Sequence, residues 1–380
     1  EGRISLRTDI SQSIIEIVTV DSSDNAVKDS LVVGNDVINA GGGNDIAFGD
    51  HGVIERITNS YPNDFLLFST ENVNRIYSTV NTVGGDDTIN AGDGNNTVVG
   101  GRGNDIITSG NGIDIVAGDN IIITLDNNIP TMMTPADDIA GNDVINLGAG
   151  GAFVIAGAGD DEVTNAAGNS VIIGDQGTIN FAANGLYANA FTGDVDVVGN
   201  DILIGGSDSD VIFGGAGSDR IMGSAGNDFL VGDAGMITRD ESLVTLESIS
   251  TSSDDGSVPE TIGFFTGDND LLDGGLDNDF MIGGFSVSDG SSISGIFKDD
   301  IKDDIFVGDL SEDIIIGEYA RMRLTIDTDQ KVTGIESIVT LGQGPLDLIR
   351  VAQQALYTAA PITSGSLSTA KVDSLVTSNG

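Results

Sequence analysis

The sequence has no cysteine, a single histidine, and only 15 Lys and Arg residues against 59 Asp and Glu residues. Without cysteine the chain forms no disulfide and no thiolate metal site, which fits an extracellular protein that avoids redox chemistry. His51 alone leaves little from which to build a Ser-His-acid triad. The formal net charge of −44 excludes a protein that binds nucleic acid through phosphate contacts, and it disfavours adsorption on anionic lipid.

Long apolar runs are also missing, because no segment reaches the roughly 18 apolar residues that a membrane-spanning helix needs. Proline is rare, with six residues, whereas glycine is abundant, with 54. Glycine does not recur at every third residue, which excludes a collagen-like chain. The hydrophobic fraction of 39% is too high for a disordered acidic tail. The chain is therefore expected to fold, with glycine at fixed backbone positions and cations neutralising its acidic groups.

Glycine and aspartate recur with a period of nine residues. The best copy, Gly100–Thr108, reads GGRGNDIIT and matches Gly-Gly-x-Gly-x-Asp-x-U-x, in which U is a large apolar residue. Five blocks of the chain keep this register. The residues at position 6 are Asp36 and Asp45 in the first block, Asp87, Asn96, Asp105 and Asp114 in the second, Asp143, Ala152, Asp161 and Ser170 in the third, Asp201, Asp210, Asp219 and Asp228 in the fourth, and Asp270, Asp279, Asp304 and Asp313 in the fifth.

This pattern resembles the calcium-binding nonapeptides of the RTX (repeats-in-toxin) family. The resemblance implies an all-β fold, a right-handed parallel β-roll or β-helix solenoid of nonapeptides over residues 34–350, with β-hairpin insertions. It also implies that turns 18 residues apart stack with Ca²⁺ between them, since one turn supplies fewer than the six to eight oxygens that calcium takes. The stacked pairs would be Asp87 with Asp105, Asn96 with Asp114, Asp143 with Asp161, Asp201 with Asp219, and Asp210 with Asp228. Ala152 with Ser170 lacks both carboxylates, so we expect an empty or weak site there.

Each block closes with a Gly-acid phrase that precedes an alternating apolar segment. The acids are Asp50, Asp119, Asp175, Asp233 and Glu318. Two interpretations stay open: these acids complete a terminal metal site, or they serve turn chemistry and exposed charge. The segments that follow predict β-hairpins by their period-two alternation. Residues 1–33 match the hairpin of a truncated repeat, so we expect more repeats upstream. Residues 351–380 lose the register, with a short helix expected near 348–356.

Position 8 of every nonapeptide is apolar and is expected to fill a thin core between two sheets. In alternate strands the flanking positions 7 and 9 are also nearly all apolar: Ile46, Phe48, Thr97, Val99, Ile115, Ala117, Phe153, Ile155, Val171, Ile173, Val211, Phe213, Phe229, Val231, Phe280, Ile282, Ile314 and Ile316. Such a stripe should not face water. Either the hairpins cover it, which we favour, or a second copy does, which would make it a surface for a homo-oligomer or filament.

These observations predict a secreted or cell-surface calcium-binding structural repeat protein of the adhesin, surface-layer, matrix or filament kind. The alternative is a calcium-dependent secretion and folding scaffold for an enzyme or toxin in the same parent chain. A third class is a module that binds sugars or surfaces through the hairpin loops. No catalytic residue is predicted, because the carboxylates form a regular lattice and His51 is replaced by other residue types in the equivalent phrases. The expected partners are calcium ions, with neither nucleic acid nor a membrane span.

Overall fold

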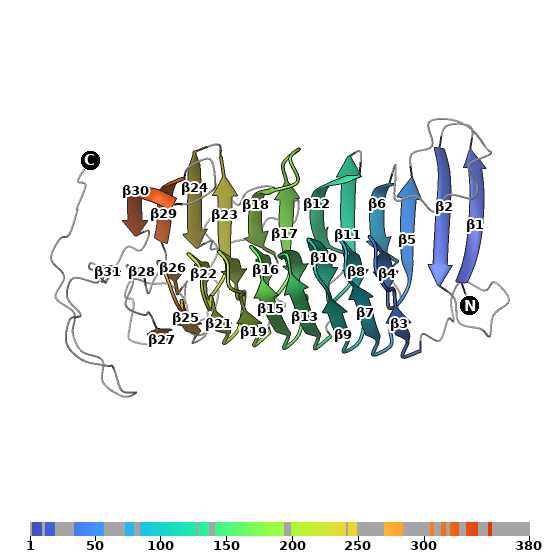
Figure 1. Ribbon diagram of the computed structural model, residues 1–380, viewed down its shortest axis with the longest axis horizontal. Coiled ribbons are helices and arrows are strands. Elements are labelled where there is room, and N and C mark those ends of the chain that lie inside the picture. The colour runs from blue at the N-terminus through green and yellow to red at the C-terminus, as the bar shows by residue number, and fades with distance from the viewer. Residues whose placement is uncertain are drawn as a thin grey trace, which may run out of the picture.

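The structure is a computed structural model that describes residues 2–9, 12–19, 34–56, 73–79, 84–126, 128–136, 141–193, 199–240, 242–248, 270–283, 305–307, 313–316, 320–326, 332–340 and 349–351. Throughout these ranges the regular elements are all β-strands. No helix in the described part is long and apolar enough to cross a membrane. The strands lie across the long axis of the molecule, one beside another (Figure 1). The prediction of an all-β fold is confirmed.

Two mainly parallel sheets carry the nonapeptides, and successive strands alternate between them. Sheet one has nine strands: β3 (Val37–Asn39), β7 (Thr88–Gly92), β9 (Ile106–Ser109), β13 (Val144–Ala149), β15 (Glu162–Ala167), β19 (Ile202–Ile204), β21 (Arg220–Met222), β25 (Leu271–Asp273) and β27 (Ile305–Val307). Sheet two has ten: β4 (Ile46–Phe48), β8 (Thr97–Val99), β10 (Asp114–Ala117), β14 (Ala152–Ile155), β16 (Val171–Ile173), β20 (Val211–Phe213), β22 (Phe229–Val231), β26 (Phe280–Ile282), β28 (Ile314–Ile316) and β31 (Ile349–Val351).

The hairpins join into a third sheet, called the hairpin sheet, which is antiparallel and has ten strands. Its strands are β5 (Gly52–Arg56), β6 (Val73–Ser78), β11 (Ile121–Asp126), β12 (Ile129–Pro135), β17 (Gly177–Phe181), β18 (Tyr187–Thr192), β23 (Gly235–Arg239), β24 (Leu243–Ser248), β29 (Ala320–Ile326) and β30 (Val332–Thr340). Separately, β1 (Gly2–Asp9) pairs antiparallel with β2 (Gln12–Thr19). Each block therefore contributes strands to three layers.

All blocks share one strand register. Ile89 pairs with Ile107 inside the second block, and Ile107 pairs with Ile145 across the intervening hairpin. The position-8 side chains form one cluster between sheets one and two, and Ile89, Ile107 and Ile145 are fully buried there. A period of two along each strand sends these residues inward and their neighbours outward. The predicted core between the two sheets is confirmed, except that the side chain of Phe306 lies outside the described ones.

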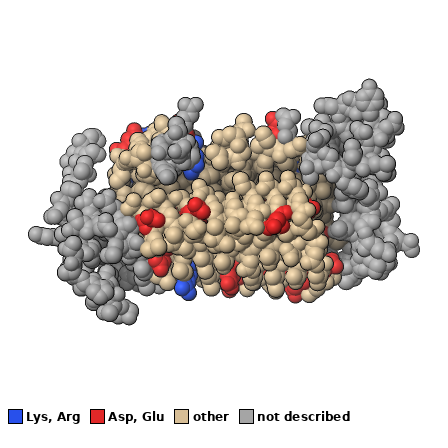
Figure 2. Space-filling view, in the orientation of Figure 1, with Lys and Arg blue, Asp and Glu red and all other residues tan. Residues whose placement is uncertain are grey.

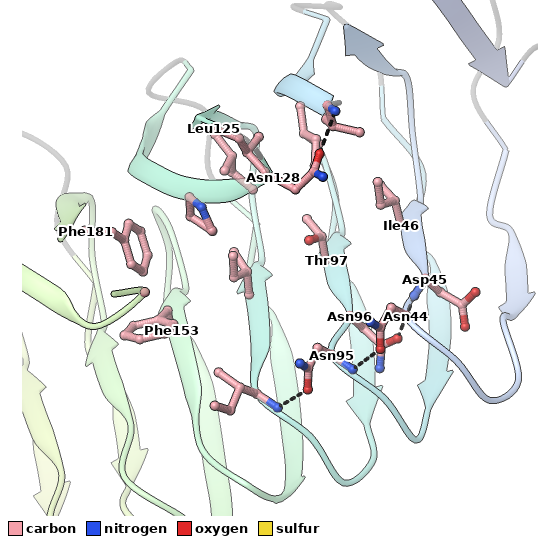
Figure 3. A pocket seen from close by; sticks show the side chains of 17 residues that line it. Asn44, Asp45, Ile46, Asn95, Asn96, Thr97, Leu125, Asn128, Phe153 and Phe181 are labelled. Carbon is pink, nitrogen blue, oxygen red and sulfur yellow. Dashed lines mark hydrogen bonds between the residues drawn. The ribbon is translucent and has the colours of Figure 1, made fainter. Parts of the chain in front are cut away.

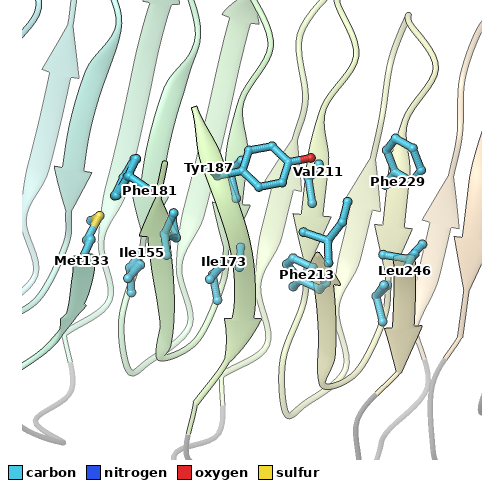
Figure 4. Packing of buried hydrophobic residues seen from close by; sticks show 14 of the residues in the cluster. Met133, Ile155, Ile173, Phe181, Tyr187, Val211, Phe213, Phe229 and Leu246 are labelled. Carbon is cyan, nitrogen blue, oxygen red and sulfur yellow. The ribbon is translucent and has the colours of Figure 1, made fainter. Parts of the chain in front are cut away.

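The outer face of sheet two packs against the hairpin sheet. Figure 4 shows Ile173 and Phe213 of sheet two lying against the layer that carries Met133, Tyr187 and Leu246. Sheet two and the hairpin sheet share one hydrophobic cluster, in which Phe213 and Ile173 are fully buried. The chain's own hairpins therefore cover the apolar stripe, as we favoured. For the described strands this face is occupied by the hairpin sheet, and a homo-oligomer or filament through it stays a prediction.

The hairpin sheet packs less closely on sheet two toward the N-terminal end. A cavity of about 340 Å³ lies there between sheet two and the hairpin sheet, and Ile46, Phe153 and Phe181 are among its lining residues (Figure 3). Ile46 and Phe153 are only partly buried, whereas their counterparts farther along sheet two are buried. The hairpin sheet thus covers sheet two more completely from β16 to β28 than at its N-terminal end.

The helix expected near residues 348–356 is wrong where the structure describes that segment. Ile349–Val351 form β31, which pairs antiparallel with β28 at the end of sheet two. The last parallel strand leaves an open edge with unpaired backbone groups, and pairing there outweighs local helix preference. Residues 352–356 lie outside the described ranges.

Candidate metal centre

The position-6 residues form two rows, one along each edge of the stacked sheets. Edge one is the row of turns that lead from sheet two to sheet one, and the hairpins also leave and return at this edge. Its described position-6 residues are Asp36, Asp87, Asp105, Asp143, Asp161, Asp201, Asp219 and Asp270. Edge two is the row of turns from sheet one to sheet two. It holds Asp45, Asn96, Asp114, Ala152, Ser170, Asp210, Asp228, Asp279 and Asp313. Asp304 lies outside the described residues.

On edge one the aspartates form an unbroken hydrogen-bonded ladder. The backbone N–H of each residue donates to Oδ1 of the next over 2.6–2.8 Å, from Asp36 to Asp270. Predicted neighbours such as Asp143 and Asp161 are directly joined in this way. The ladder also continues across the hairpins, for example from Asp105 to Asp143, which 18-residue spacing alone did not predict. The aspartates therefore stack as a single row rather than as separate pairs.

The ladder uses only one oxygen of each carboxylate. The other oxygen, Oδ2, is buried and accepts no hydrogen bond within the described chain in six consecutive members: Asp87, Asp105, Asp143, Asp161, Asp201 and Asp219. These residues are at most 3% exposed. Burying a carboxylate oxygen that has no hydrogen-bond or cation partner costs several times more folding free energy than burying one that has a partner. Six such oxygen atoms in a row therefore form a set of potential metal ligands, which a bound cation would satisfy.

The glycine at position 1 keeps the space beside these oxygens open. A Cβ atom on Gly100 would collide with Oδ2 of Asp105 and with the carbonyl oxygen of Gly118 in the next turn. The same two kinds of oxygen lie beside Gly214, namely Oδ2 of Asp219 and the Gly232 carbonyl. Gly101 and Gly103 take positive φ, so positions 2 and 4 need glycine for conformation. Glycine at position 1 leaves room beside the carboxylate, and the turn of Asp161 has the buried Ala156 there instead.

Carboxylate and carbonyl oxygens are the ligands that Ca²⁺ takes, so the residues present fit this ion. Among the described residues, no three His, Cys, Asp or Glu side chains come together as a metal-binding group. Carbonyl oxygens of the glycine turns would therefore have to complete each coordination shell. Few Asp and Glu side chains of the described residues are seen on the face drawn in Figure 2, and most of the position-6 aspartates are buried.

Burial makes these carboxylates hard to ionise in the absence of a cation. Desolvation, and next the nearby Asp161, raises the pKa of Asp143 to about 9. Desolvation, with Asp219 as the next cause, likewise raises the pKa of Asp201 to about 9. Burial raises the pKa of Asp105 to about 8. A row of ionised aspartates at neutral pH thus requires positive charge beside it.

The acids of the block-closing phrases accept hydrogen bonds from edge-one turns. The N–H of Arg102 donates to Oδ2 of Asp50 (2.7 Å), and the N–H of Ala158 donates to Oδ2 of Asp119 (2.7 Å). Asp175 accepts in the same way from Ala216. The backbone of these acids also takes part: the N–H of Asp233 donates to the carbonyl of Gly283 (3.0 Å), as the N–H of Asp175 does to the carbonyl of Gly214 (3.2 Å).

Of the two interpretations for these acids, the turn role is observed, and the ligand role stays a prediction. It has most support at Asp175, whose Oδ1 is buried and accepts no hydrogen bond within the described chain. Burial, with nearby Asp201 as the next cause, raises the pKa of Asp175 well above its usual range. Glu318 lies outside the described residues.

Sequence reasoning missed a second ladder at position 5. The N–H of Asn104 donates to Oδ1 of Asp86 (2.9 Å), and the N–H of Asn142 donates to Oδ1 of Asn104 (2.8 Å). These side chains are exposed, so they fasten the outer side of each turn while position 6 fastens the inner side. The signal was present in the sequence, because Asn or Asp often stands directly before the position-6 residue.

A test of the position-1 space is the substitution Gly214→Ala. Its added methyl group would collide with the Asp219 carboxylate and the Gly232 carbonyl, so we expect a loss of about 1–3 kcal/mol in the free energy of unfolding in Ca²⁺. Urea unfolding measures this loss. The matched control is Gly34→Ala, which meets no atom within 4 Å and should stay within about 0.5 kcal/mol of the parent. Equal stability of the two variants would contradict the steric role.

A protein-family model described as RTX calcium-binding nonapeptide repeat (4 copies) matches residues 33–52, 82–116, 140–172, 198–235 and 266–285. The matched segments hold most of the glycine turns and strands of sheets one and two, but β27, β28 and β31 lie beyond the last of them. The hairpins lie largely between the matched segments. No curated protein matches the chain. No solved structure matches it either. RTX nonapeptides bind Ca²⁺, and several segments imply several ions. These five segments of the chain are therefore RTX calcium-binding nonapeptide repeats.

Proposed function

We propose that this chain is a structural segment of a larger secreted repeat protein, which folds and stiffens when it binds Ca²⁺ outside the cell. The observation that carries the proposal is the row of six buried Oδ2 atoms on edge one that accept no hydrogen bond within the described chain. The position-6 aspartates are the proposed ligands, with Asp175 the best supported of the block-closing acids. An adhesin, surface layer, matrix or filament is the proposed setting.

Charge explains why folding would follow calcium. The chain carries a formal charge of −44, so a compact state without cations repels itself. Calcium that binds only the folded form stabilises it by mass action, increasingly so as its concentration exceeds the dissociation constant. We infer a right-handed β-roll over residues 34–350, flanked by a hairpin segment at 1–33 and a degenerate segment at 351–380.

The arrangement of the described residues supports a structural rather than catalytic role. The repeated geometry of this chain is a lattice, with the same turn-to-turn hydrogen bond in the second, third and fourth blocks. His51 is buried, and neither ring nitrogen has a hydrogen-bond partner within the described chain. Burial lowers the pKa of His51, which keeps the ring neutral. An imidazole held in this way supports packing rather than proton transfer.

A calcium titration tests the proposal. Far-ultraviolet circular dichroism should show little strand signal in chelator and a cooperative gain as Ca²⁺ reaches millimolar concentration. The control is Mg²⁺ at the same concentration, which demands a smaller octahedral shell and should restore much less strand. Full strand signal in chelator, unchanged by Ca²⁺, would refute the metal-dependent fold. Light scattering on the same samples would show whether folded chains assemble.

A further inference from the structure

Edge two differs from edge one in the side-chain groups that stand at position 6, inside its turns. Along the middle of edge two the position-6 residues include Asn96, Ala152 and Ser170, so the row of carboxylates is interrupted. The backbone N–H of Asp114 accordingly donates to the Gly151 carbonyl (3.3 Å), because Ala152 has no side-chain acceptor. The ladder resumes where the N–H of Ala152 donates to Oγ of Ser170 (2.9 Å), and the N–H of Ser170 then donates to Oδ1 of Asp210 (2.7 Å).

Asn96 accepts the same backbone hydrogen bond as an aspartate of the ladder, but inside the turn it offers an N–H donor in place of a carboxylate oxygen. Its Oδ1 accepts the N–H of Asp45 (3.0 Å), which is the ladder contact and fixes the orientation of the amide. Its Nδ2 therefore stands where an aspartate would place Oδ2. That nitrogen donates to the carbonyls of Gly92 (3.1 Å) and Gly94 (3.0 Å) in its own turn. Figure 3 shows Asn96 beside Asp45 in this row.

A second amide serves the turn that ends at Ser170. Asn165 stands at position 1, where most edge-one turns have glycine, and its side chain is buried. Its Nδ2 donates to the Gly168 carbonyl and to Oγ of Ser170, both over 3.0 Å. Ser170 Oγ in turn accepts the N–H of Ala152 (2.9 Å). The Gly168 carbonyl and Ser170 Oγ are thus bound by a hydrogen-bond donor, whereas Oδ1 of Asn165 is buried and accepts no hydrogen bond within the described chain.

We propose that the side-chain amides of Asn96 and Asn165 replace Ca²⁺ in these two turns, so that the middle of edge two closes without metal. A cation and an N–H group both attract oxygen, but only the carboxylate turns need a net positive charge. Calcium would then bind along edge one and only toward the two ends of edge two, where Asp45 and Asp228 keep a buried Oδ2 that accepts no hydrogen bond within the described chain. This inference rests on the proposed ligand role of the position-6 aspartates.

The test is the number of Ca²⁺ ions bound per chain, measured by equilibrium dialysis with metal analysis on the full chain. Asn96→Asp should add one ion, because it exchanges the amide donor for a carboxylate oxygen. The double variant Asn165→Gly with Ser170→Asp should also add one, because it restores the glycine and the carboxylate of the repeat. Asp105→Asn on edge one should remove one ion.

The outcomes separate this inference from the proposed function. If Asp105→Asn loses an ion while both edge-two variants bind the parent number, the amide replacement is wrong and the calcium-dependent fold stands. If the parent chain binds no Ca²⁺, the proposed function itself fails.

Hydrogen exchange on the unaltered chain decides the matter should the variants not fold. At limiting Ca²⁺, the turns at 91–96 and 165–170 should keep their protection when the turn at 100–105 has lost it. Simultaneous loss in all three would overturn the inference.

Discussion

In chelator, the strand signal of the chain is expected to grow as the pH falls from about 8 to about 5, whereas in millimolar Ca²⁺ the thermal midpoint should fall over the same interval. The two slopes have opposite signs because different species neutralise the aspartates. Protons do so in chelator, and calcium does so when it is present. Circular dichroism melts at each pH, with and without Ca²⁺, measure both slopes.

The sign in chelator follows from the raised pKa values. Burial raises the pKa of Asp87 and Asp219 to about 7 and that of Asp143 to about 9, from an ordinary value of 3.8. Between pH 3.8 and about 9 the folded state holds more protons than the unfolded state, so stability is lost as the pH rises. Below pH 3.8 both states are protonated, and this contribution is fully present. In Ca²⁺ the ligands must be ionised, so protons compete with the metal.

General charge repulsion could produce part of the gain in chelator, since acid also lowers the net charge. Salt separates the two causes. About 0.5 M NaCl at pH 8 screens exposed charges but leaves buried carboxylates desolvated, so it should restore much less strand than acid does. Slopes of the same sign in chelator and in Ca²⁺ would contradict the assignment of the buried row as the metal-binding groups.

Substituting Phe213 by alanine should cost about 3–5 kcal/mol of the free energy of unfolding in Ca²⁺. Phe213 ends β20 on the outer face of sheet two and is fully buried under the hairpin sheet. Its ring lies against Gly235 at the start of β23, where a Cβ atom would collide with it. Removing the ring leaves a cavity between two rigid sheets that cannot collapse to fill it. Urea unfolding in saturating Ca²⁺ measures the loss.

The matched control for Phe213→Ala is Ile202→Ala in the same block. Ile202 lies in β19 of sheet one and is 38% exposed, so its truncation should cost less than about 1 kcal/mol. If the two variants lose equal stability, the hairpin sheet does not seal sheet two, and the apolar stripe must find another cover.

The strand register could be predicted from the sequence because the nine-residue period marks each turn and the apolar residue after it. Ile107 and Ile145 illustrate this, since each follows its aspartate by two residues and both are fully buried. The joining of the hairpins into one sheet was harder to predict from the sequence, because the hairpin segments vary in length and carry no fixed motif. The pairing of Met133 with Ile179, from hairpins of different blocks, depends on the stacking beneath them.

The stacking of the position-6 residues into rows could be predicted from the sequence, but the hydrogen bonds that each side chain makes inside its turn could not. The spacing of Asp87 and Asp105 indicates their stacking, and the structure confirms it. The spacing gives no sign that Asn96 turns its amide donors toward the glycine carbonyls, because asparagine and aspartate have the same shape in such a pattern. Only the hydrogen-bond partners distinguish an oxygen that needs positive charge from a nitrogen that is already satisfied.

The strands lie across the long axis of the molecule, so the backbone hydrogen bonds between successive strands run along that axis (Figure 1). A load pulling the two ends apart would strain those bonds one rung at a time rather than many together in shear. The array would then lengthen by peeling, each released coil adding slack before the next one is stressed. Such a tether yields gradually under tension and absorbs work over a long extension.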